Sequence, residues 1–381
     1  MNVSLYKQCT NCVLDTNDDP NITFDEKGIC KYCTEYKFKA GLVNDPERGK
    51  KLEKIISAIK ETGKGKKYDC LVGVSGGVDS TYVALLAKKY GLRPLIVHFD
   101  NGWNSELAVK NIENIIQKLG FDLYTYVINW EEFRDMQRAY FKADVVDIEA
   151  LTDHAIYAVK HKLAKKHGIK YLISGSNVVT EGVLPPHWVH RKLDWLNIKS
   201  IHKKFGEVKL KTYPKFTFLN SFYFKWFYKA QVFTILDYVE YDKEKAKQTI
   251  ITELEWKDYG GKHHESLFTK FYQAHILPEK FHIDKRRAHY STLICSGQIK
   301  KQQALKELEK PIYDPIKLKE DKEFVLKKLG FSNEWFDAYL KRSPVSHFSY
   351  PTYTNKQWVW ERKFYQLALP VVRFLRKLVG R

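Results

Sequence analysis

Short apolar runs alternate with amphipathic segments between residues 68 and 177. Strands are predicted where four to seven mostly apolar residues follow one another, at 70–74, 93–99, 122–128 and 171–174. Helices are predicted where apolar residues recur with helical spacing, at 81–90, 104–120 and 131–168. Regular alternation of strand and helix is typical of an α/β domain with a doubly wound, mostly parallel sheet.

The pattern changes on both sides of this region. A Lys-rich amphipathic helix is predicted at 46–67, and helical patterns return at 298–309 and 311–342. Residues 184–227 read as loops and irregular helices. We expect three parts: a small ribbon at 1–40, the α/β domain at 41–310 and a helical C-terminal region at 311–381.

Two further segments leave alternatives open. The aromatic and basic stretch 213–233 fits a stacking surface for sugars or bases, but an aromatic core or subunit interface is favoured. The tail 358–381 is apolar and basic and is interrupted by Pro370. The tail can lie on a membrane surface or pack on a partner or on the main domain.

The first strand runs into the sequence SGGVDS, where a helix begins. The first amides of a helix lack partners within it and bind anions, and Gly76 and Gly77 let the backbone approach a ligand closely. Ser75 and Ser80 add hydroxyl donors. An acidic Asp79 at an anion site makes sense if it holds a Mg²⁺ that bridges phosphates.

No Lys follows the glycines at the Walker spacing. The loop Ser75–Ser80 instead resembles the PP-loop, SGGxDS, of the ATP pyrophosphatases. That resemblance implies cleavage of ATP between its α- and β-phosphates, with a carbonyl oxygen activated as its adenylate. The alternative to a PP-loop is an ordinary strand and turn followed by a capped helix.

Polar residues also follow the other strands. Ligands bind beyond the carboxyl ends of parallel strands, so Asp100 should contact the nucleoside of ATP. Gly175 and Asn177 follow the fourth strand and are candidates for binding the nucleotide or the activated carbonyl. Glu181 is a candidate second carboxylate for Mg²⁺, or equally a loop residue.

Four cysteines form two pairs near the N-terminus, C-x-x-C at Cys9 and Cys12 and again at Cys30 and Cys33. This spacing predicts one tetrahedral Zn²⁺ site. Four thiolates leave no open position, which favours a structural role over a redox or iron–sulfur one. Because the ribbon is too small to hold a core, metal should supply its folding energy, and its loss should leave ATP binding intact.

A basic group follows the predicted sheet. Lys285 and Arg286 are candidates for stabilising departing pyrophosphate in the transition state, although a solvated charge run is the alternative. Residues 262–265 are predicted to open a helix after two glycines. Within it, His263 and His264 can act as bases or merely cap and pack.

Composition narrows the class of protein. The net charge of +19 favours anionic partners such as nucleotide-linked sugars, nucleic acid or an anionic membrane face. Neither a signal peptide nor an apolar run long enough to span a membrane is expected, and six cysteines do not suggest a disulfide scaffold. A cytoplasmic enzyme is the expectation.

The cysteine-rich opening 9–33, the loop, the segment WKDYGGKHHES and the stretch 277–299 together resemble the N-acetyl sugar amidotransferase family. The resemblance extends from Cys9 to about Leu305. It implies a role in O-antigen or lipopolysaccharide biosynthesis. The reaction it implies converts an acetamido group of a nucleotide-activated sugar to an acetamidino group, with ATP, Mg²⁺ and ammonia.

The ammonia source is expected to be another protein. Asn2 follows Met1, and outside the ribbon only Cys70 and Cys295 remain, neither in a nucleophile-like context. The resemblance implies a glutaminase subunit with a cyclase-like subunit that channels ammonia. The runner-up is a PP-loop enzyme that modifies tRNA, a thiolase or lysidine-type synthetase, which the ribbon and the positive charge also fit.

Overall fold

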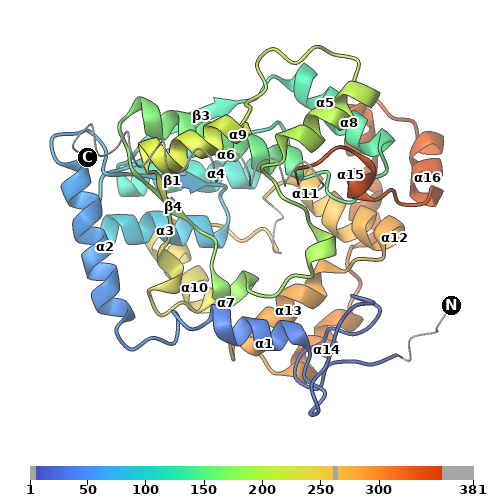
Figure 1. Ribbon diagram of the computed structural model, residues 1–381, viewed down its shortest axis with the longest axis horizontal. Coiled ribbons are helices and arrows are strands. Elements are labelled where there is room, and N and C mark those ends of the chain that lie inside the picture. Colours follow the sequence, from blue (N-terminus) through green and yellow to red (C-terminus); the bar gives the residue numbers. More distant parts are fainter. Residues whose placement is uncertain (1–5, 261–264, 354–381) are drawn as a thin grey trace.

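The computed structural model describes residues 6–260 and 265–353 (Figure 1). A parallel five-stranded sheet in the order β3-β2-β1-β4-β5 crosses its middle. The strands are β1 (Cys70–Val74), β2 (Pro94–Asp100), β3 (Asp122–Val127), β4 (Tyr171–Ser174) and β5 (Gln231–Thr234). The predicted doubly wound parallel sheet is therefore confirmed, and β4 lies beside β1 as expected.

Strand β5 was not predicted from the sequence. Its four residues lie at the edge of the sheet, and Gln231 and Val232 are exposed, so the strand carries almost no apolar pattern of its own. The segment is held in the extended conformation of a strand by its pairing with β4.

Helices cover both faces of the sheet (Figure 1). Apolar side chains of one face of the sheet pack with α2 (Arg48–Gly63), α3 (Val78–Lys89), α4 (Glu106–Leu119) and α10 (Lys243–Leu254). The other face packs with α5 (Trp130–Lys142), α6 (Ala150–Lys166) and α8 (Trp195–Phe205). The same core reaches into the N-terminal ribbon and the C-terminal helices, through residues such as Leu14 and Phe336.

The single helix predicted at 131–168 is wrong, because the chain forms α5 and α6 with a break between them. Asp144 has a φ of 56°, a left-handed conformation that ends a helix. Val145 and Ile148 in the connection are buried, which is why the apolar pattern looked continuous.

The remaining helices lie mostly around the carboxyl edge of the sheet. They are α1 (Lys31–Lys39), α7 (Val178–Glu181), α9 (Phe218–Tyr223), α11 (Leu267–Phe271), α12 (Leu277–Phe281), α13 (Lys285–Cys295), α14 (Lys301–Glu309), α15 (Pro315–Leu329) and α16 (Asn333–Lys341). Short 3₁₀ turns occur at Pro186–Trp188, Ile235–Asp237 and His347–Ser349, and π-helical turns at Phe224–Tyr228 and Tyr272–Ile276. The histidine pair His263 and His264, for which the sequence leaves open a role as bases or in capping, and the tail 358–381 lie outside the described residues.

The aromatic stretch 213–233 is divided between core and surface. Tyr213, Phe216 and Phe224 are buried, and the ring of Phe224 meets that of His161 at 4.8 Å. Leu219 and Phe227 are exposed. Throughout residues 6–260 and 265–353, no helix is long and apolar enough to cross a membrane.

Candidate active site

The turn between β1 and α3 is closed by its own serines. The backbone amide of Ser75 donates to the Ser80 hydroxyl at 3.2 Å, and the two hydroxyls lie 3.3 Å apart. The amide of Gly77 donates to the Ser75 hydroxyl at 3.3 Å. These hydrogen bonds fix the shape of the loop at the first turn of a twelve-residue helix, where unpaired amides favour the binding of an anion.

Two glycines permit close approaches at this turn. Gly76 has a φ of 85°, and a Cβ atom there would lie 2.8 Å from the carbonyl oxygen of Ala108. A Cβ atom on Gly175 would lie 3.2 Å from the amide nitrogen of Ser80. Side chains at either position would push α4 or the end of β4 away from the loop.

The loop borders two adjoining spaces. A pocket of about 360 Å³ is lined by Ser75, Gly77, Asp79, Ser80 and Gly175. A larger cavity of about 900 Å³ also includes Ser75 and Ser80 in its wall. Glu181, Lys243 and Glu265 line both spaces. One ligand can therefore place phosphates on the loop and extend into the larger cavity.

Five carboxylates line the smaller pocket, those of Asp79, Glu181, Glu244, Asp258 and Glu265. Tyr241 donates its phenolic hydrogen to Asp79, and burial together with that carboxylate raises the pKa of Tyr241. In the described part of the chain only the cysteines gather three or more ligand atoms around one point. Carboxylates that do not converge on one point can still bind Mg²⁺, because this ion keeps several water ligands and also binds phosphate oxygens of the substrate.

His98 at the end of β2 lines the larger cavity. Its Nδ1 lies 3.1 Å from the carbonyl oxygen of Val74, and its Nε2 lies 3.1 Å from the Asn104 amide nitrogen. Burial lowers the pKa of His98, which favours the neutral ring. The carbonyl requires a proton on Nδ1, so Nε2 accepts from Asn104.

Two residues predicted to contact the nucleotide have other partners. Asp100 accepts from the Gly102 amide at 2.8 Å and from the Asn104 side chain at 3.2 Å, and does not line either space. Its neighbour Asn101 lines the larger cavity. Asn177 is buried and caps α7, accepting from the amide of Thr180 at 2.8 Å.

Lys285 and Arg286 line the larger cavity together with Ser75 and Ser80. Neither borders the smaller pocket. The Arg286 guanidinium is bound to the Asp284 carboxylate at 2.8 Å and to the carbonyl oxygen of Lys310 at 2.8 Å. Lys285 makes no hydrogen bond or ion pair within the described residues, so its ammonium faces the cavity unpaired.

Sequence reasoning did not single out several residues that the fold brings to the site. They are His98, Lys160, Tyr241, Lys243 and Glu265. Each is an isolated polar residue in its own segment, and no spacing pattern marks any of them. Only the alternation of strand β2, with a polar residue near its carboxyl end, offered a hint of His98.

The sulfur atoms of Cys9, Cys12, Cys30 and Cys33 lie within 4.8 Å of one another and are buried. The sulfur–sulfur distance is 3.8 Å between Cys9 and Cys33, 3.6 Å between Cys12 and Cys30, and 3.7 Å between Cys30 and Cys33. A tetrahedron with metal–sulfur bonds of about 2.3 Å has edges of about 3.8 Å. The four cysteines therefore fit one metal ion.

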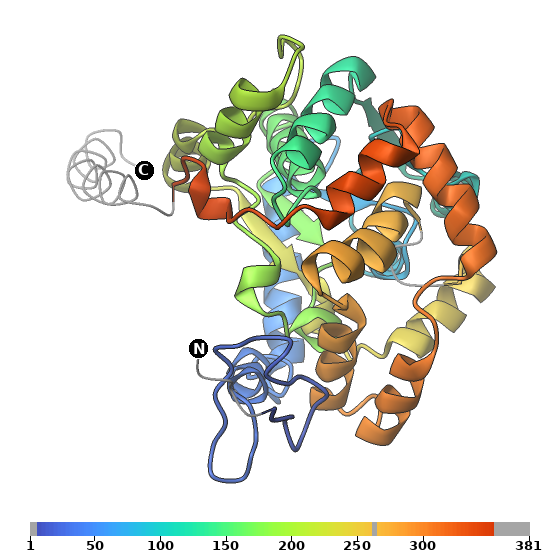
Figure 2. The ribbon, with the colours of Figure 1, turned by 90° about the vertical axis from the view of Figure 1, so that its right-hand side faces the viewer.

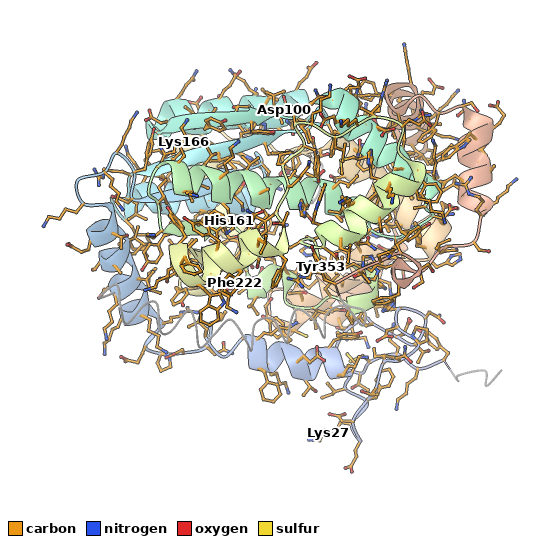
Figure 3. All side chains as sticks on the ribbon, turned by 45° about the horizontal axis from the view of Figure 1, so that its top comes forward. Lys27, Asp100, His161, Lys166, Phe222 and Tyr353 are labelled. Carbon is orange, nitrogen blue, oxygen red and sulfur yellow. The ribbon has the colours of Figure 1, made fainter. Side chains whose placement is uncertain are left out.

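The ribbon touches the helix that carries Lys285. On α13, Arg287 bonds the carboxylates of Asp15 and Asp18, the latter at 2.7 Å. Ser291 accepts from the amide of Val13 at 3.4 Å. Figure 2 shows the ribbon beside α13 and α14. In Figure 3, Lys27 at the ribbon tip lies on the opposite side of the molecule from Asp100.

Comparison with known proteins gives matches along much of the chain. Residues 265–365 match the family described as "LPS biosynthesis protein WbpG-like, C-terminal domain". Uncharacterized protein MJ1599 of Methanocaldococcus jannaschii is 26% identical over 313 residues, which cover 80% of this chain and 94% of that protein.

Two enzymes match over shorter segments. A GMP synthase (glutamine-hydrolyzing) of Aeropyrum pernix is 30% identical over 137 residues, 34% of this chain and 26% of that enzyme. A tRNA(Ile)-lysidine synthase of Thermus thermophilus is 26% identical over 110 residues, 28% of this chain and 20% of that enzyme. The chain thus spans about a quarter of the length of the first enzyme and a fifth of the length of the second.

A solved NH₃-dependent NAD synthetase from Campylobacter jejuni covers 41% of this chain and 72% of its own, at 16% identity and a TM-score of 0.29. That score is too low to support an argument about the site. The SGGVDS loop lies at the carboxyl edge of the parallel sheet, and residues 265–365 are similar to the WbpG-like C-terminal domain family.

Proposed function

We propose that this chain is an ATP-dependent amidotransferase that converts an acetamido group of a nucleotide-activated sugar to an acetamidino group. The observation that carries the proposal is the composition of the larger cavity. One wall is the loop that holds ATP, through Ser75 and Ser80. Another is built by residues between 265 and 312, all of them within the region that matches the WbpG-like family of lipopolysaccharide biosynthesis.

The first step is adenylation. The acetamide oxygen of the sugar attacks the α-phosphorus of ATP, the bond between the α-phosphorus and the bridging oxygen breaks, and pyrophosphate leaves with its electron pair. Loop amides at the start of α3 and the unpaired ammonium of Lys285 are suited to stabilise the growing negative charge. The amide nitrogen loses its proton to solvent, and the product is an O-adenylyl imidate.

The second step uses ammonia. Its nitrogen attacks the imidate carbon, the bond to the adenylyl oxygen breaks, and AMP carries away the former amide oxygen. One proton passes from the attacking nitrogen to solvent, leaving an amidine in place of the amide. The substitution replaces an oxygen atom by NH.

Ammonia is supplied by a partner glutaminase, joined by a cyclase-like subunit that channels it. Cys70 is fully buried in β1, and burial raises the pKa of its thiol. Cys295 ends α13, and its sulfur lies 3.5 Å from that of Cys33, beside the four-cysteine cluster of the ribbon. Neither cysteine is placed to act as the nucleophile of a glutaminase.

Two metals complete the proposed enzyme. Zn²⁺ on Cys9, Cys12, Cys30 and Cys33 would stabilise the ribbon, because four thiolates leave no position for a substrate. Mg²⁺ would be held by Asp79 and Glu181, with phosphate oxygens and water as its other ligands, and would neutralise phosphate charge.

The test is an ATP turnover assay with the full chain, ammonium salt and Mg²⁺. UDP- and CMP-linked diacetamido sugars and bulk tRNA are offered in parallel, and AMP, pyrophosphate and product mass are measured. We expect AMP and pyrophosphate only with a sugar nucleotide, and a product about one mass unit lighter than its substrate, from the exchange of O for NH.

The matched variant is Asp79→Asn, which keeps the shape of the side chain but removes its charge. We expect at least a hundredfold loss of pyrophosphate release with an unchanged melting temperature. Wild-type release by the folded variant would contradict the role given to Asp79. Absence of turnover with every sugar nucleotide would contradict the proposed substrate.

A second candidate is a PP-loop enzyme that modifies tRNA. It is favoured by the similarity to a tRNA(Ile)-lysidine synthase and by the net charge of +19. Turnover with tRNA alone in the same assay would establish this function and would assign the basic surface to RNA binding.

A further inference from the structure

Lys160 lies in the middle of α6 and extends along the underside of β1. A Cβ atom on Gly73 would lie 3.6 Å from Lys160 Cδ and 4.0 Å from Lys160 Nζ. The Lys160 side chain therefore lies close to Gly73 of β1. Ser75 directly follows β1, two residues after Gly73, and Lys160 and Ser75 line the same cavity.

Most other lysines in the cavity wall have partners. Lys192 pairs with Asp147 at 2.6 Å and Asp153 at 3.2 Å, and Lys270 pairs with Asp321 at 2.8 Å. Lys310 pairs with Glu307 at 2.7 Å. Within residues 6–260 and 265–353, no hydrogen bond or ion pair reaches the Lys160 ammonium.

An unpaired ammonium in this position is costly without an anion. Burial lowers the pKa of Lys160, and Asp153 is the acid that acts on it. That carboxylate is already bound to Lys192. Lys160 is half-buried, and partial loss of an ammonium's hydration without a compensating charge is unfavourable, which favours a counter-ion or a ligand beside it.

Resting on the proposed use of ATP, we propose that Lys160 binds the α-phosphoryl group, the one transferred to the acceptor. The leaving pyrophosphate has the loop amides and the smaller pocket, which Lys160 does not border. Ser75 borders both spaces and marks the boundary between them. Lys160 lies on the cavity side of that boundary, where the α-phosphoryl group meets the acceptor.

The test measures binding rather than turnover. The wild-type chain and Lys160→Met are titrated calorimetrically with AMP, inorganic pyrophosphate and UDP. Methionine keeps the apolar stem and removes the charge. We expect AMP to bind roughly tenfold to a hundredfold more weakly, as for loss of a charged hydrogen bond, and pyrophosphate affinity to change less than about twofold.

Two controls distinguish ligand binding from a structural role. Lys162→Met removes an exposed charge from the same helix and should leave all three affinities unchanged. Lys160→Arg should recover part of the AMP affinity. The ligand-free Lys160→Met protein should melt at the wild-type temperature or above it, because the change removes an uncompensated charge.

The assignment is overturned if Lys160→Met binds AMP as the wild type does, or if only UDP binding weakens, which would place the acceptor's phosphate at Lys160. A lowered melting temperature with equal losses for every ligand would make the residue structural. If the wild-type protein binds AMP but turns over no sugar nucleotide, only the proposed function is contradicted. A wild type that binds neither AMP nor pyrophosphate would overturn both.

Discussion

Gly76 is the residue of the loop that depends most on having no side chain. It combines a left-handed φ of 85° with a backbone carbonyl, that of Ala108, at 2.8 Å from the position of a Cβ atom. Its own carbonyl accepts from the Trp256 indole at 2.7 Å, which prevents the turn from moving away. Contacts from two distant parts of the chain, at Ala108 and Trp256, thus meet at one glycine.

Replacing Gly76 by alanine should therefore cost more than the left-handed backbone alone. We expect Gly76→Ala to reduce the free energy of unfolding by about 3 kcal/mol and to weaken ATP binding. Gly65→Ala is the matched control, since Gly65 has a φ of 74° but nothing within 4 Å of its Cβ position. Its expected cost is about 1 kcal/mol. Urea unfolding of the two variants makes the comparison, and equal costs would show that the contact with Ala108 is unimportant.

At the scale of elements, α13 connects the metal ribbon to the active site. One end of the helix carries Lys285 into the cavity, and two residues later Arg287 bonds the ribbon carboxylates of Asp15 and Asp18. Both carboxylates are buried. The sequence predicts a ribbon that can unfold alone, but these contacts couple it to one wall of the cavity.

Arg287→Met should leave two buried carboxylates without their cation. We expect a loss of about 3 kcal/mol in the free energy of unfolding and weaker retention of zinc after exposure to a chelator. Lys27→Met is the control, because that exposed ribbon side chain points away from the protein (Figure 3). Zinc content by atomic absorption and urea unfolding are the measurements. Wild-type values for Arg287→Met would mean that the ribbon and α13 are not coupled.

At the scale of the whole molecule, two buried histidines of α6 make the fold sensitive to acid. Burial lowers the pKa of His154 and of His161 to about 4. The Nε2 atom of His154 accepts from the amide of Phe216 at 2.9 Å, so protonation there would break that bond. Both rings are consequently neutral in the folded protein near pH 7.

The sign of the pH dependence follows from these values. The folded pKa of about 4 lies below the ordinary value of 6.5, so the unfolded chain binds protons first as the pH falls. Each histidine should lower the free energy of unfolding by about 2 kcal/mol between pH 7 and pH 5. The loss of unfolding free energy between pH 7 and pH 5 should be about 2 kcal/mol smaller in His161→Phe than in the wild type. Urea unfolding at both pH values measures this difference. An unchanged difference would mean that His161 is not held neutral.

How much was predictable depends on how far apart the interacting residues lie in the sequence. The loop Ser75–Ser80 and the cysteine pairs are local patterns, in which neighbours along the chain perform one task. Strand periodicity is equally local, and β1 and β4 were predicted residue for residue. The break between α5 and α6 was missed, because buried residues in a connection resemble those of a helix.

By itself, then, the sequence determined a parallel α/β sheet, a phosphate loop and four metal-binding thiols, since these rest on short-range spacing and backbone chemistry. Only the tertiary structure decided which charged side chains have a hydrogen-bond or ion-pair partner. It paired Arg286 with Asp284, turned Asp100 toward Gly102 and left Lys160 and Lys285 facing the cavity. It also placed Tyr241 on Asp79, 162 positions away in the chain. The pairing of Tyr241 with Asp79 and the placement of Lys160 at the cavity depend on packing between distant elements, and no local pattern encodes them.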